Sequence, residues 1–366
     1  MAITVGALRE TAAGERRVAI TPEMAKKMRG RGWRVLLERD AGTRAGFPDA
    51  LYADVEFASA DQVCAQVDLL ACVLPPADGA IAGMREGAVL VGQLRPYGAA
   101  ERIAAMSARK LAAYALELLP RTTRAQAMDV LSSQAAVSGY RAMLIAAEAA
   151  PKFFPMLTTA AGTIRPSRVL VIGAGVAGLQ AIATARRLGA QTEGYDVRPE
   201  TREQVESLGA KFIELGVSAA GSGGYARELS AEERAAQQQA LADHLKNVDV
   251  IVSTAAVPGR PAPKILTAAM VAGMKPGALI VDLAAESGGN CELTRPGERV
   301  EQGGVTIVGP LNLPAGAPLH ASEMYARNVF NFVELLIKDD AVAPDDADEL
   351  IARSCVTRDG TARFTG

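Results

Sequence analysis

The sequence lacks the residue patterns that several kinds of site require. It has only two histidines, His244 and His320, which are far apart, and its four cysteines are scattered without a CxxC pair. This usage suggests no metal site and is typical of reduced, buried thiols in a cytoplasmic protein. The formal net charge of −2 provides no basic surface for nucleic acid.

The sequence also lacks a targeting segment and a membrane span. Residues 1–5 run straight into Arg9 and Glu10, which is no signal-peptide pattern. The most apolar long uncharged run, 169–185, approaches the lower length limit for a span, but its glycines and Gln180 fit a strand, a turn and a helix better. The run 302–322 is interrupted by prolines, glycines and polar residues. We therefore predict no membrane-spanning helix.

The first third of the chain alternates apolar runs with helical patterns. A length of 366 residues allows two domains, and 49% hydrophobic with 22% charged residues is ordinary for a soluble globular protein. Thr21 and Pro22 predict a helix start, with a hydroxyl cap and a proline in the first turn. Alternating strands and helices imply a parallel sheet covered on both faces. The strands expected here are 3–6, 34–38, 67–74, 88–91 and 112–116.

A second unit follows a long apolar-periodic helix over 129–150. Its strand count is that of a doubly wound dinucleotide fold, and a further helix at 321–337 is expected to return to the first domain. We therefore predict an α/β fold of two Rossmann-like domains with parallel sheets, 1–130 plus 318–366 and 131–317, with an NAD site in the interdomain cleft. The strands expected in the second unit are 168–172, 191–195, 211–214, 248–253, 278–283 and 305–308.

The most informative segment is a glycine-rich turn that follows the apolar run 169–172 and precedes a helix-like run. Gly173 permits a tight turn, Gly175 lets a pyrophosphate approach the backbone, and Gly178 lets the helix pack closely on the strand. The helix N-terminus offers N–H groups and a positive dipole end to phosphates. The alternative is a purely structural turn. The candidate pyrophosphate contacts are Gly173, Gly175, Val176, Ala177 and Gly178.

Asp196 is an acidic residue at a position that suits contact with a ribose. Asp196 ends the next short run, 18 residues beyond Gly178, and its carboxylate can accept hydrogen bonds from a ribose diol. Because a carboxylate repels a 2′-phosphate, Asp196 favours NAD over NADP. Arg198, two residues on, is able to receive that phosphate, so the sequence leaves this alternative open.

Two polar segments admit a structural and a functional interpretation. Residues 216–230 are rich in glycine and serine, and form either a flexible surface linker or a mobile flap that carries Tyr225 toward the cofactor. Residues 120–134 supply two arginines, two glutamines, an acid and several hydroxyls. They form either a solvated loop with Asp129 or Ser132 as a helix N-cap, or a set of ligand contacts between two domains.

At residues 120–134 the chain closely resembles the NAD(H)-binding component of proton-translocating NAD(P) transhydrogenases, in the form of a separate soluble subunit. The resemblance covers nearly the whole chain, and many segments match in order. Besides this loop they are 15–22 (ERRVAITP), 139–142 (GYRA), 159–163 (TAAGT), 203–209 (EQVESLG), 223–226 (GGYA), 258–263 (PGRPAP) and 281–291 (VDLAAESGGNC).

Alanine dehydrogenases share this architecture and are the competing family. They use a lysine where this chain has Leu74, and a histidine after the next strand, where residues 91–95 (VGQLR) have none. Arg17 resembles their carboxylate-binding arginine and is retained, and Glu286 corresponds to their catalytic aspartate. Without the lysine and the histidine, acid–base work on an amino or oxo acid lacks its usual groups, so we expect poor oxidation of alanine.

The transhydrogenase resemblance implies roles for individual residues. In that family the polar loop holds the nicotinamide and its ribose, and the matching positions are Arg121, Gln126, Asp129 and Ser132. Arg121 and Asp129 are implied to orient the nicotinamide ribose and carboxamide, and Gln126 to reach toward the NADP(H) of a partner subunit. Tyr225 matches the tip of the family's mobile loop. Asp196 and the glycines hold the adenosine ribose and the pyrophosphate. The remaining matches around that pocket are Val197, Arg198, Gly224, Gln237 and Ala256.

The implied reaction is direct hydride transfer between NAD(H) on this chain and NADP(H) on a partner. No acid–base residue is needed, because the protein only has to align the two nicotinamides, about 3–3.5 Å apart, and exclude water. The family couples this step to proton movement through a membrane subunit. The resemblance therefore implies a homodimer that is peripheral at the cytoplasmic face of the membrane, with membrane-spanning and NADP(H)-binding partner subunits. An amino-acid dehydrogenase and a non-catalytic NAD-binding module are the alternatives.

Overall fold

The computed structural model describes residues 2–215, 230–257 and 259–364, without the side chains of Arg234 and Gln237. It divides into two compact units, each with its own sheet. Unit 1 comprises Met1–Gln134 and Pro314–Gly366, and unit 2 comprises Ala135–Leu313. These divisions lie a few residues from those expected. The connecting helix α5 (Val130–Ala149) begins in unit 1 and continues into unit 2.

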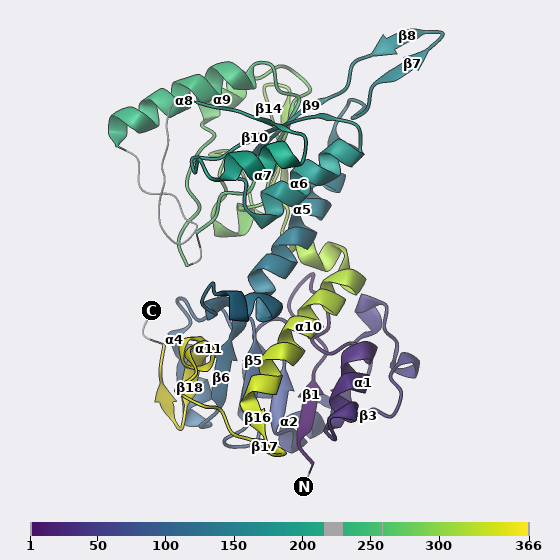
Figure 1. Ribbon diagram of the computed structural model, residues 1–366, viewed down its shortest axis with the longest axis vertical. Helices are drawn as coiled ribbons and strands as arrows, with labels where there is room; N and C mark the ends of the chain where they lie inside the picture. Colours follow the sequence, from purple (N-terminus) through teal and green to yellow (C-terminus); the bar gives the residue numbers. More distant parts are fainter. Residues whose placement is uncertain (1, 216–229, 258, 365–366) are drawn as a thin grey trace. The chain divides into compact units, whose positions relative to one another are not determined.

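Unit 1 contains an eight-stranded sheet of order β19-β18-β6-β5-β4-β1-β2-β3 (Figure 1). The first six strands of the chain pair in parallel, and β18 and β19 add an antiparallel edge. The strands are β1 (Thr4–Ala7), β2 (Arg34–Glu38), β3 (Glu56–Ala58), β4 (Leu69–Ala71), β5 (Val89–Gly92), β6 (Ala112–Ala115), β18 (Cys355–Arg358) and β19 (Thr361–Ala362). A separate small ladder joins β16 (Ile337–Lys338) to β17 (Ala341–Val342).

Alternate residues of these strands face two apolar layers, as expected for a sheet covered on both sides. Leu69 and Val89 belong to the layer that contains Met24 of α1 and Phe332 of α10, whereas Leu70 belongs to the layer under α2, α3 and α4. The helices are α1 (Pro22–Gly30), α2 (Ala60–Gln66), α3 (Asp78–Gly83), α4 (Ala100–Ala108), α10 (Pro318–Leu336) and α11 (Glu349–Ser354). The short 3₁₀ turns of unit 1 are η1 (Thr43–Ala45), η2 (Asp49–Leu51), η3 (Leu116–Leu118), η4 (Thr123–Met128) and η6 (Leu313–Gly316), the last of which begins at the unit boundary.

Unit 2 contains a seven-stranded sheet of order β11-β10-β9-β12-β13-β15-β14. Apart from the antiparallel edge strand β14, this is the order of a doubly wound dinucleotide fold, with its switch point between β9 and β12. The strands are β9 (Arg168–Ile172), β10 (Gln191–Tyr195), β11 (Lys211–Phe212), β12 (Val250–Ser253), β13 (Leu279–Asp282), β14 (Arg299–Gln302) and β15 (Val305–Val308). A separate hairpin joins β7 (Leu157–Thr159) to β8 (Gly162–Ile164).

The sheet of unit 2 also has an apolar layer on each face. Val169 and Val171 pack with α5, α6 and α7, and Leu170 and Ile172 pack with α8 and α9. These strands read as continuous apolar runs because both of their faces are buried. The helices are α6 (Val176–Arg187), α7 (Thr201–Ser207), α8 (Ala231–Leu245) and α9 (Ala268–Ala272), with the 3₁₀ turn η5 (Ala285–Ser287).

The predicted α/β fold with two parallel-dominated sheets is confirmed, with corrections in detail. The predicted hydroxyl cap of α1 is wrong: Thr21 makes no side-chain cap bond, and Pro22 begins the helix. The strand expected over 67–74 is confined to Leu69–Ala71. Helix α10 begins at Pro318, three residues before its expected start. The sequence prediction missed β3, β7, β8, β14 and β16–β19, which are short. All of them except β18, which lies between β19 and β6, are at sheet edges or in two-stranded ladders.

Candidate functional site

The glycine-rich turn connects β9 to α6. Gly173 has a φ of +94°, a conformation that L side chains rarely adopt. A methyl group on Gly178 would overlap the carbonyl oxygen of Gly173, so the helix approaches the turn as closely as a glycine allows. Among the described residues, a methyl group on Gly175 would meet no atom within 4 Å. The backbone therefore borders open space at Gly175 and is tightly packed at Gly178.

The N-terminus of α6 has no side-chain cap. Its N-cap residue is Gly175, and Val176 in the first turn is 44% exposed. No acidic residue stands in this first turn. Uncapped N–H groups at a helix N-terminus, together with the helix dipole, attract an anion such as a pyrophosphate. Val176 and Ala177 thus belong to a backbone surface that suits phosphate groups.

Asp196 follows β10 and is joined to the glycine-rich turn. Its Oδ2 accepts a hydrogen bond of 2.7 Å from the N–H of Ala174, and Arg198 donates to both carboxylate oxygens from its backbone N–H, Nε and Nη2 at 2.8–2.9 Å. Burial raises the pKa of Asp196, but the hydrogen bonds from Arg198 and Ala174 outweigh it and hold the pKa below its ordinary value. A ribose diol that binds Asp196 therefore has to compete with Arg198. Val197 is half-buried beside them.

The segment after β12 borders the same turn. Thr254 donates from Oγ1 to the carbonyl of Gly173 at 2.9 Å, and Ala256 just beyond it is exposed. Unit 2 therefore brings together the glycines, Asp196 and the segment that contains Ala256. Gly224 and Tyr225, with the flap expected over 216–230, fall outside the described residues except for Ser230, and so does the side chain of Gln237 on α8.

The polar loop 120–134 is anchored to unit 1 through its backbone. Asn328 and Asn331 of α10 both donate from Nδ2 to the carbonyl of Ala127 at 2.9 Å. Ala125 and Met128 are buried in the core of the unit, and Arg124 pairs with Asp348. Arg121 and Gln126 are exposed on this anchored backbone.

Asp129 is the N-cap of α5, which was the structural alternative for this loop. Its Oδ1 accepts the N–H of Ser132 at 2.9 Å, and its Oδ2 accepts the hydroxyl of Ser132 at 2.6 Å. This is the ordinary pattern of a helix cap, in which the side chain accepts the N–H of the third helical residue. Asp129 can cap the helix and also contact a ligand, because a carboxylate has about four acceptor positions.

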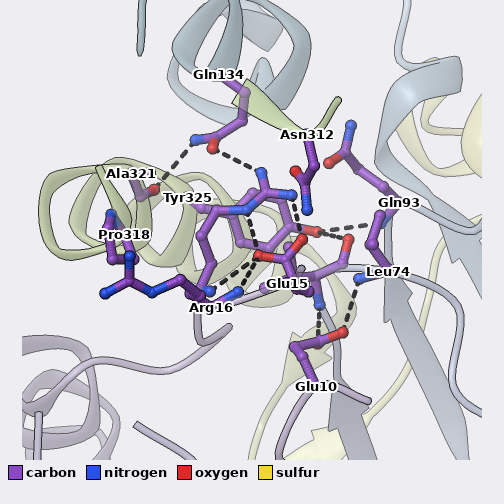
Figure 2. A network of polar contacts seen from close by, with 12 residues as sticks. Glu10, Glu15, Arg16, Leu74, Gln93, Gln134, Asn312, Pro318, Ala321 and Tyr325 are labelled. Carbon is purple, nitrogen blue, oxygen red and sulfur yellow. Dashed lines mark hydrogen bonds and ion pairs between the residues drawn. The ribbon is translucent and has the colours of Figure 1, made fainter. Parts of the chain in front are cut away.

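A buried network in unit 1 surrounds Arg17 and includes Glu15 and Gln134, which are labelled in Figure 2. The guanidinium of Arg17 makes a two-pronged ion pair with Glu15, at 2.9 Å and 2.7 Å, and donates to Oε1 of Gln134 at 2.8 Å. Gln134 in turn donates to the carbonyl of Ala321 at 3.1 Å. Arg17 is 4% exposed and Glu15 fully buried, so the charge of Arg17 is neutralised within the unit. Sequence reasoning gave Arg17 a role but gave none to Glu15 or Gln134. The contacts of Gln134 with Arg17 and Ala321 join distant parts of the chain, whereas Glu15 lies only two residues from Arg17.

Two acidic side chains hold the turns that follow neighbouring strands of unit 1. Glu10 accepts the N–H of Val73 at 2.6 Å and that of Leu74 at 3.3 Å, beyond the end of β4. Burial raises the pKa of Glu10 to about 7. Tyr325 of α10 lies between the two turns: it donates to the carbonyl of Cys72 at 2.8 Å and accepts the N–H of Gln93 at 3.1 Å (Figure 2).

Glu117 makes the matching arrangement beyond the end of β5. It accepts the N–H of Leu94 at 3.2 Å and that of Arg95 at 2.6 Å, and burial raises its pKa. Arg95 has a positive φ of 47° at this turn. Neither Glu10 nor Glu117 was predicted, because an isolated acid in a loop gives no periodic signal.

The described residues contain no group of three or more His, Cys, Asp and Glu side chains placed to hold a metal ion. All four cysteines are buried and free, as predicted from their spacing. In the part of the chain that the structure describes, no helix is both long enough and apolar enough to cross a membrane.

Comparisons with known proteins find similar proteins for both units of the chain. The family model "Alanine dehydrogenase/PNT, N-terminal domain" matches residues 6–138, and "Alanine dehydrogenase/PNT, C-terminal domain" matches residues 142–365. The chain is 45% identical to an NAD(P) transhydrogenase subunit alpha of Rhodospirillum rubrum, covering 96% of this chain and 95% of that protein.

A solved structure and a more distant relative are also similar to this chain. The crystal structure of transhydrogenase from Sinorhizobium meliloti superposes with a TM-score of 0.90 at 42% identity, covering 98% of this chain and 99% of that one. Alanine dehydrogenase of Mycolicibacterium smegmatis is 27% identical, covering 97% of this chain and 93% of that protein.

Proposed function

Because this chain belongs to the alanine dehydrogenase/PNT family, we propose that it is the NAD(H)-binding component of a Re/Si-specific, proton-translocating NAD(P) transhydrogenase. In this role it takes part in hydride transfer between NAD(H) on this chain and NADP(H) on a partner subunit. One contrast carries the proposal: unit 2 has a dinucleotide turn, whereas the described network around Arg17 in unit 1 contains neither lysine nor histidine.

The residues of unit 2 fit a dinucleotide. The open space beside Gly175 and the uncapped N-terminus of α6 suit a pyrophosphate. Asp196, which contacts the same turn, suits a ribose diol and disfavours a 2′-phosphate, so we assign NAD(H) to this chain. Gly224, Gln237 and the exposed Ala256 are proposed to line the same pocket, on the family resemblance. When bound, the nicotinamide accepts or donates a hydride.

The polar loop is proposed to orient the nicotinamide half. Arg121 and Gln126 are exposed on a backbone that Asn328 and Asn331 hold in place, which suits side chains that must present a fixed geometry. Asp129 and Ser132 follow closely in the chain and hold each other by two hydrogen bonds. Tyr225 is proposed to cover the cofactor and exclude water.

The network around Arg17 disfavours an amino-acid dehydrogenase. Glu15 and Gln134 already occupy its guanidinium, and Leu74 offers a buried apolar side chain where the related dehydrogenases use a lysine. A substrate carboxylate would have to compete with Glu15 and Gln134 for Arg17, and the described network offers no lysine or histidine to take a proton from the amino acid.

We further propose a homodimer that docks, at the cytoplasmic face of the membrane, on membrane-spanning and NADP(H)-binding subunits. The hairpin β7–β8 supports a self-association surface, because it pairs with no other strand of the described chain. Apolar side chains gather on and beside it: Phe153 is 54% exposed, Met156 65%, Leu157 39% and Ile164 45%. Isolated hairpins are marginally stable, and clustered exposed apolar groups mark contact surfaces.

Stopped-flow measurement of hydride transfer tests the proposal. The chain is mixed with NADH, or an acetylpyridine analogue, and a purified NADP(H)-binding partner domain, and alanine and pyruvate-plus-ammonia assays run beside it. Rapid transfer that requires both proteins is expected. Turnover of alanine without transhydrogenation would favour the dehydrogenase instead. Tight NADH binding with neither activity would favour a non-catalytic NAD-binding module.

A further inference from the structure

The loop that follows β12 begins beside the glycine-rich turn and carries exposed residues. Thr254 contacts the carbonyl of Gly173, and from there the described residues 255–257 and 259–263 pass outside the carboxyl end of the sheet. Val257 is 39% exposed, and Ala256 and Arg260 are exposed as well. In a doubly wound sheet, ligands bind in this region, at the switch point between β9 and β12.

One buried side chain ties both ends of this loop together. The side-chain amide of Asn290 accepts the N–H of Ala255 at 3.0 Å and donates to the carbonyl of the same residue at 2.7 Å. These two hydrogen bonds resemble those between paired residues of neighbouring strands. The same Nδ2 donates to the carbonyl of Pro263 at 2.9 Å. Asn290 is fully buried, and both of its side-chain polar atoms are used on the loop.

The segment that carries Asn290 is itself held from the sheet. Asp282, at the end of β13, accepts the N–H of Cys291 at 3.0 Å and the hydroxyl of Thr294 at 2.6 Å with Oδ2. Its Oδ1 accepts the hydroxyl of Ser253, at the end of β12, at 3.1 Å. Asn290 therefore links the loop to the two strand ends that Asp282 joins.

We infer that Asn290 is a positioning residue, which sets the loop 255–263 for the nicotinamide half of the dinucleotide. This inference rests on the proposed function. Asp196 lies on the β10 side of the switch point and takes the adenosine ribose, so the loop on the β12 side is left to face the other half of the molecule. The two anchors, Ala255 and Pro263, restrict the conformation of the described exposed residues between them, Ala256, Val257 and 259–261.

Comparing two ligands tests this role. NADH has both halves of the dinucleotide, whereas ADP-ribose lacks the nicotinamide. Asn290→Asp keeps the size of the side chain but replaces the donor to the carbonyls of Ala255 and Pro263 by an acceptor. The Kd of NADH is expected to rise at least tenfold, and that of ADP-ribose to change less than twofold, both measured by calorimetry on the full chain. Asn290→Ser, which is shorter and uncharged, is expected to shift the ratio of the two Kd values in the same direction, and this ratio does not depend on the fraction of folded protein.

Ser167→Ala is the matched control. Ser167 is fully buried in unit 2 and donates to the carbonyl of Phe153 at 2.7 Å, at the opposite end of the sheet from the loop. It is expected to lower the melting midpoint while leaving the ratio of the two Kd values unchanged. Equal losses for both ligands in the Asn290 variants, or no loss for either, would overturn the positioning role. If the unaltered chain binds no NADH, it is the proposed function that fails.

Discussion

Gly175 and Gly178 stand in the same turn and are expected to respond to alanine in opposite ways. Gly175 has φ −80° and ψ −169°, which alanine adopts without strain, and its missing side chain faces open space. Alanine reduces the conformational freedom of the unfolded chain, which raises the free energy of unfolding by about 0.4–1 kcal/mol. Alanine is also a poorer N-cap residue than glycine, which lowers the free energy of unfolding by a similar amount. Gly175→Ala should therefore change the free energy of unfolding by less than about 1 kcal/mol, since these two effects offset each other.

The effect of Gly175→Ala on binding should be larger. The added methyl group enters the space that a pyrophosphate would occupy against the backbone. Displacement of the phosphate, even by a fraction of an ångström, weakens its hydrogen bonds to the first turn of α6. We expect the Kd of NADH to rise at least tenfold, which corresponds to about 1.4 kcal/mol.

Gly178→Ala should act on folding instead. Its Cβ would overlap the carbonyl oxygen of Gly173 and lie 2.9 Å from the carbonyl carbon, well inside the ~3.5–4.0 Å of a normal carbon contact. Overpacking of this kind costs about 1–3 kcal/mol, and it lowers the melting midpoint of a unit of this size by about 3–10 °C.

Melting curves and NADH titrations of both variants check this pair of expectations. The reasoning is refuted if Gly175→Ala binds NADH as the unaltered chain does, because the phosphate then does not lie against this residue. It is also refuted if Gly178→Ala melts at an unchanged temperature.

Three further predictions use other parts of the molecule. Gln126→Asn should slow hydride transfer far more than it weakens NADH binding, because Gln126 is exposed on an anchored loop; equal losses in stopped-flow and titration would count against its role. Asp196→Ala should weaken NADH binding by about 1–3 kcal/mol, the cost of losing a buried hydrogen-bonding partner, and an unchanged affinity would move the ribose contact elsewhere. Burial raises the pKa of Glu10 from 4.5 to about 7, so the folded chain keeps a proton that the unfolded chain releases within this window. The contribution of Glu10 to stability is therefore greatest at acidic pH and falls as the pH rises through 7, by at most about 3 kcal/mol. Glu10→Gln should reduce this fall. If the melting midpoint changes by the same amount between pH 5 and pH 8 in the variant and in the unaltered chain, the prediction is contradicted.

The sequence predicts the parts of the fold that local patterns specify. The central strands of unit 2 are continuous apolar runs because both faces are buried, and β9, β10 and β15 have the predicted limits. Edge strands have no such pattern. Arg299–Gln302 in β14 is largely exposed, and Leu157–Thr159 in β7 is wholly exposed, so neither differs from a loop in composition.

The residues of the candidate site also fall into those that a local sequence pattern predicts and those that it does not. Gly173, Gly178 and Asp196 are recognisable because the turn and its spacing need those residue types in one stretch of chain. The roles of Gln134 as a partner of Arg17 and of Asn290 as the loop anchor are not recognisable, because their contacts join segments that only the folded chain brings together. The pairing of Arg198 with Asp196 was also unforeseen, since the sequence offered Arg198 as a receiver of phosphate and the structure has it neutralising the acid.

The carboxyl groups at the strand ends of unit 1 have a consequence for stoichiometry. Backbone N–H groups beyond the carboxyl ends of parallel strands attract hydrogen-bond acceptors, and in unit 1 the chain supplies them: Glu10 after β4 and Glu117 after β5. At these turns of unit 1 the backbone N–H groups already have side-chain partners, whereas in unit 2 the N–H groups at the start of α6, which follows β9, have no side-chain cap. Under the proposed function, one dinucleotide binds per chain, so hydride transfer between two dinucleotides requires a second protein.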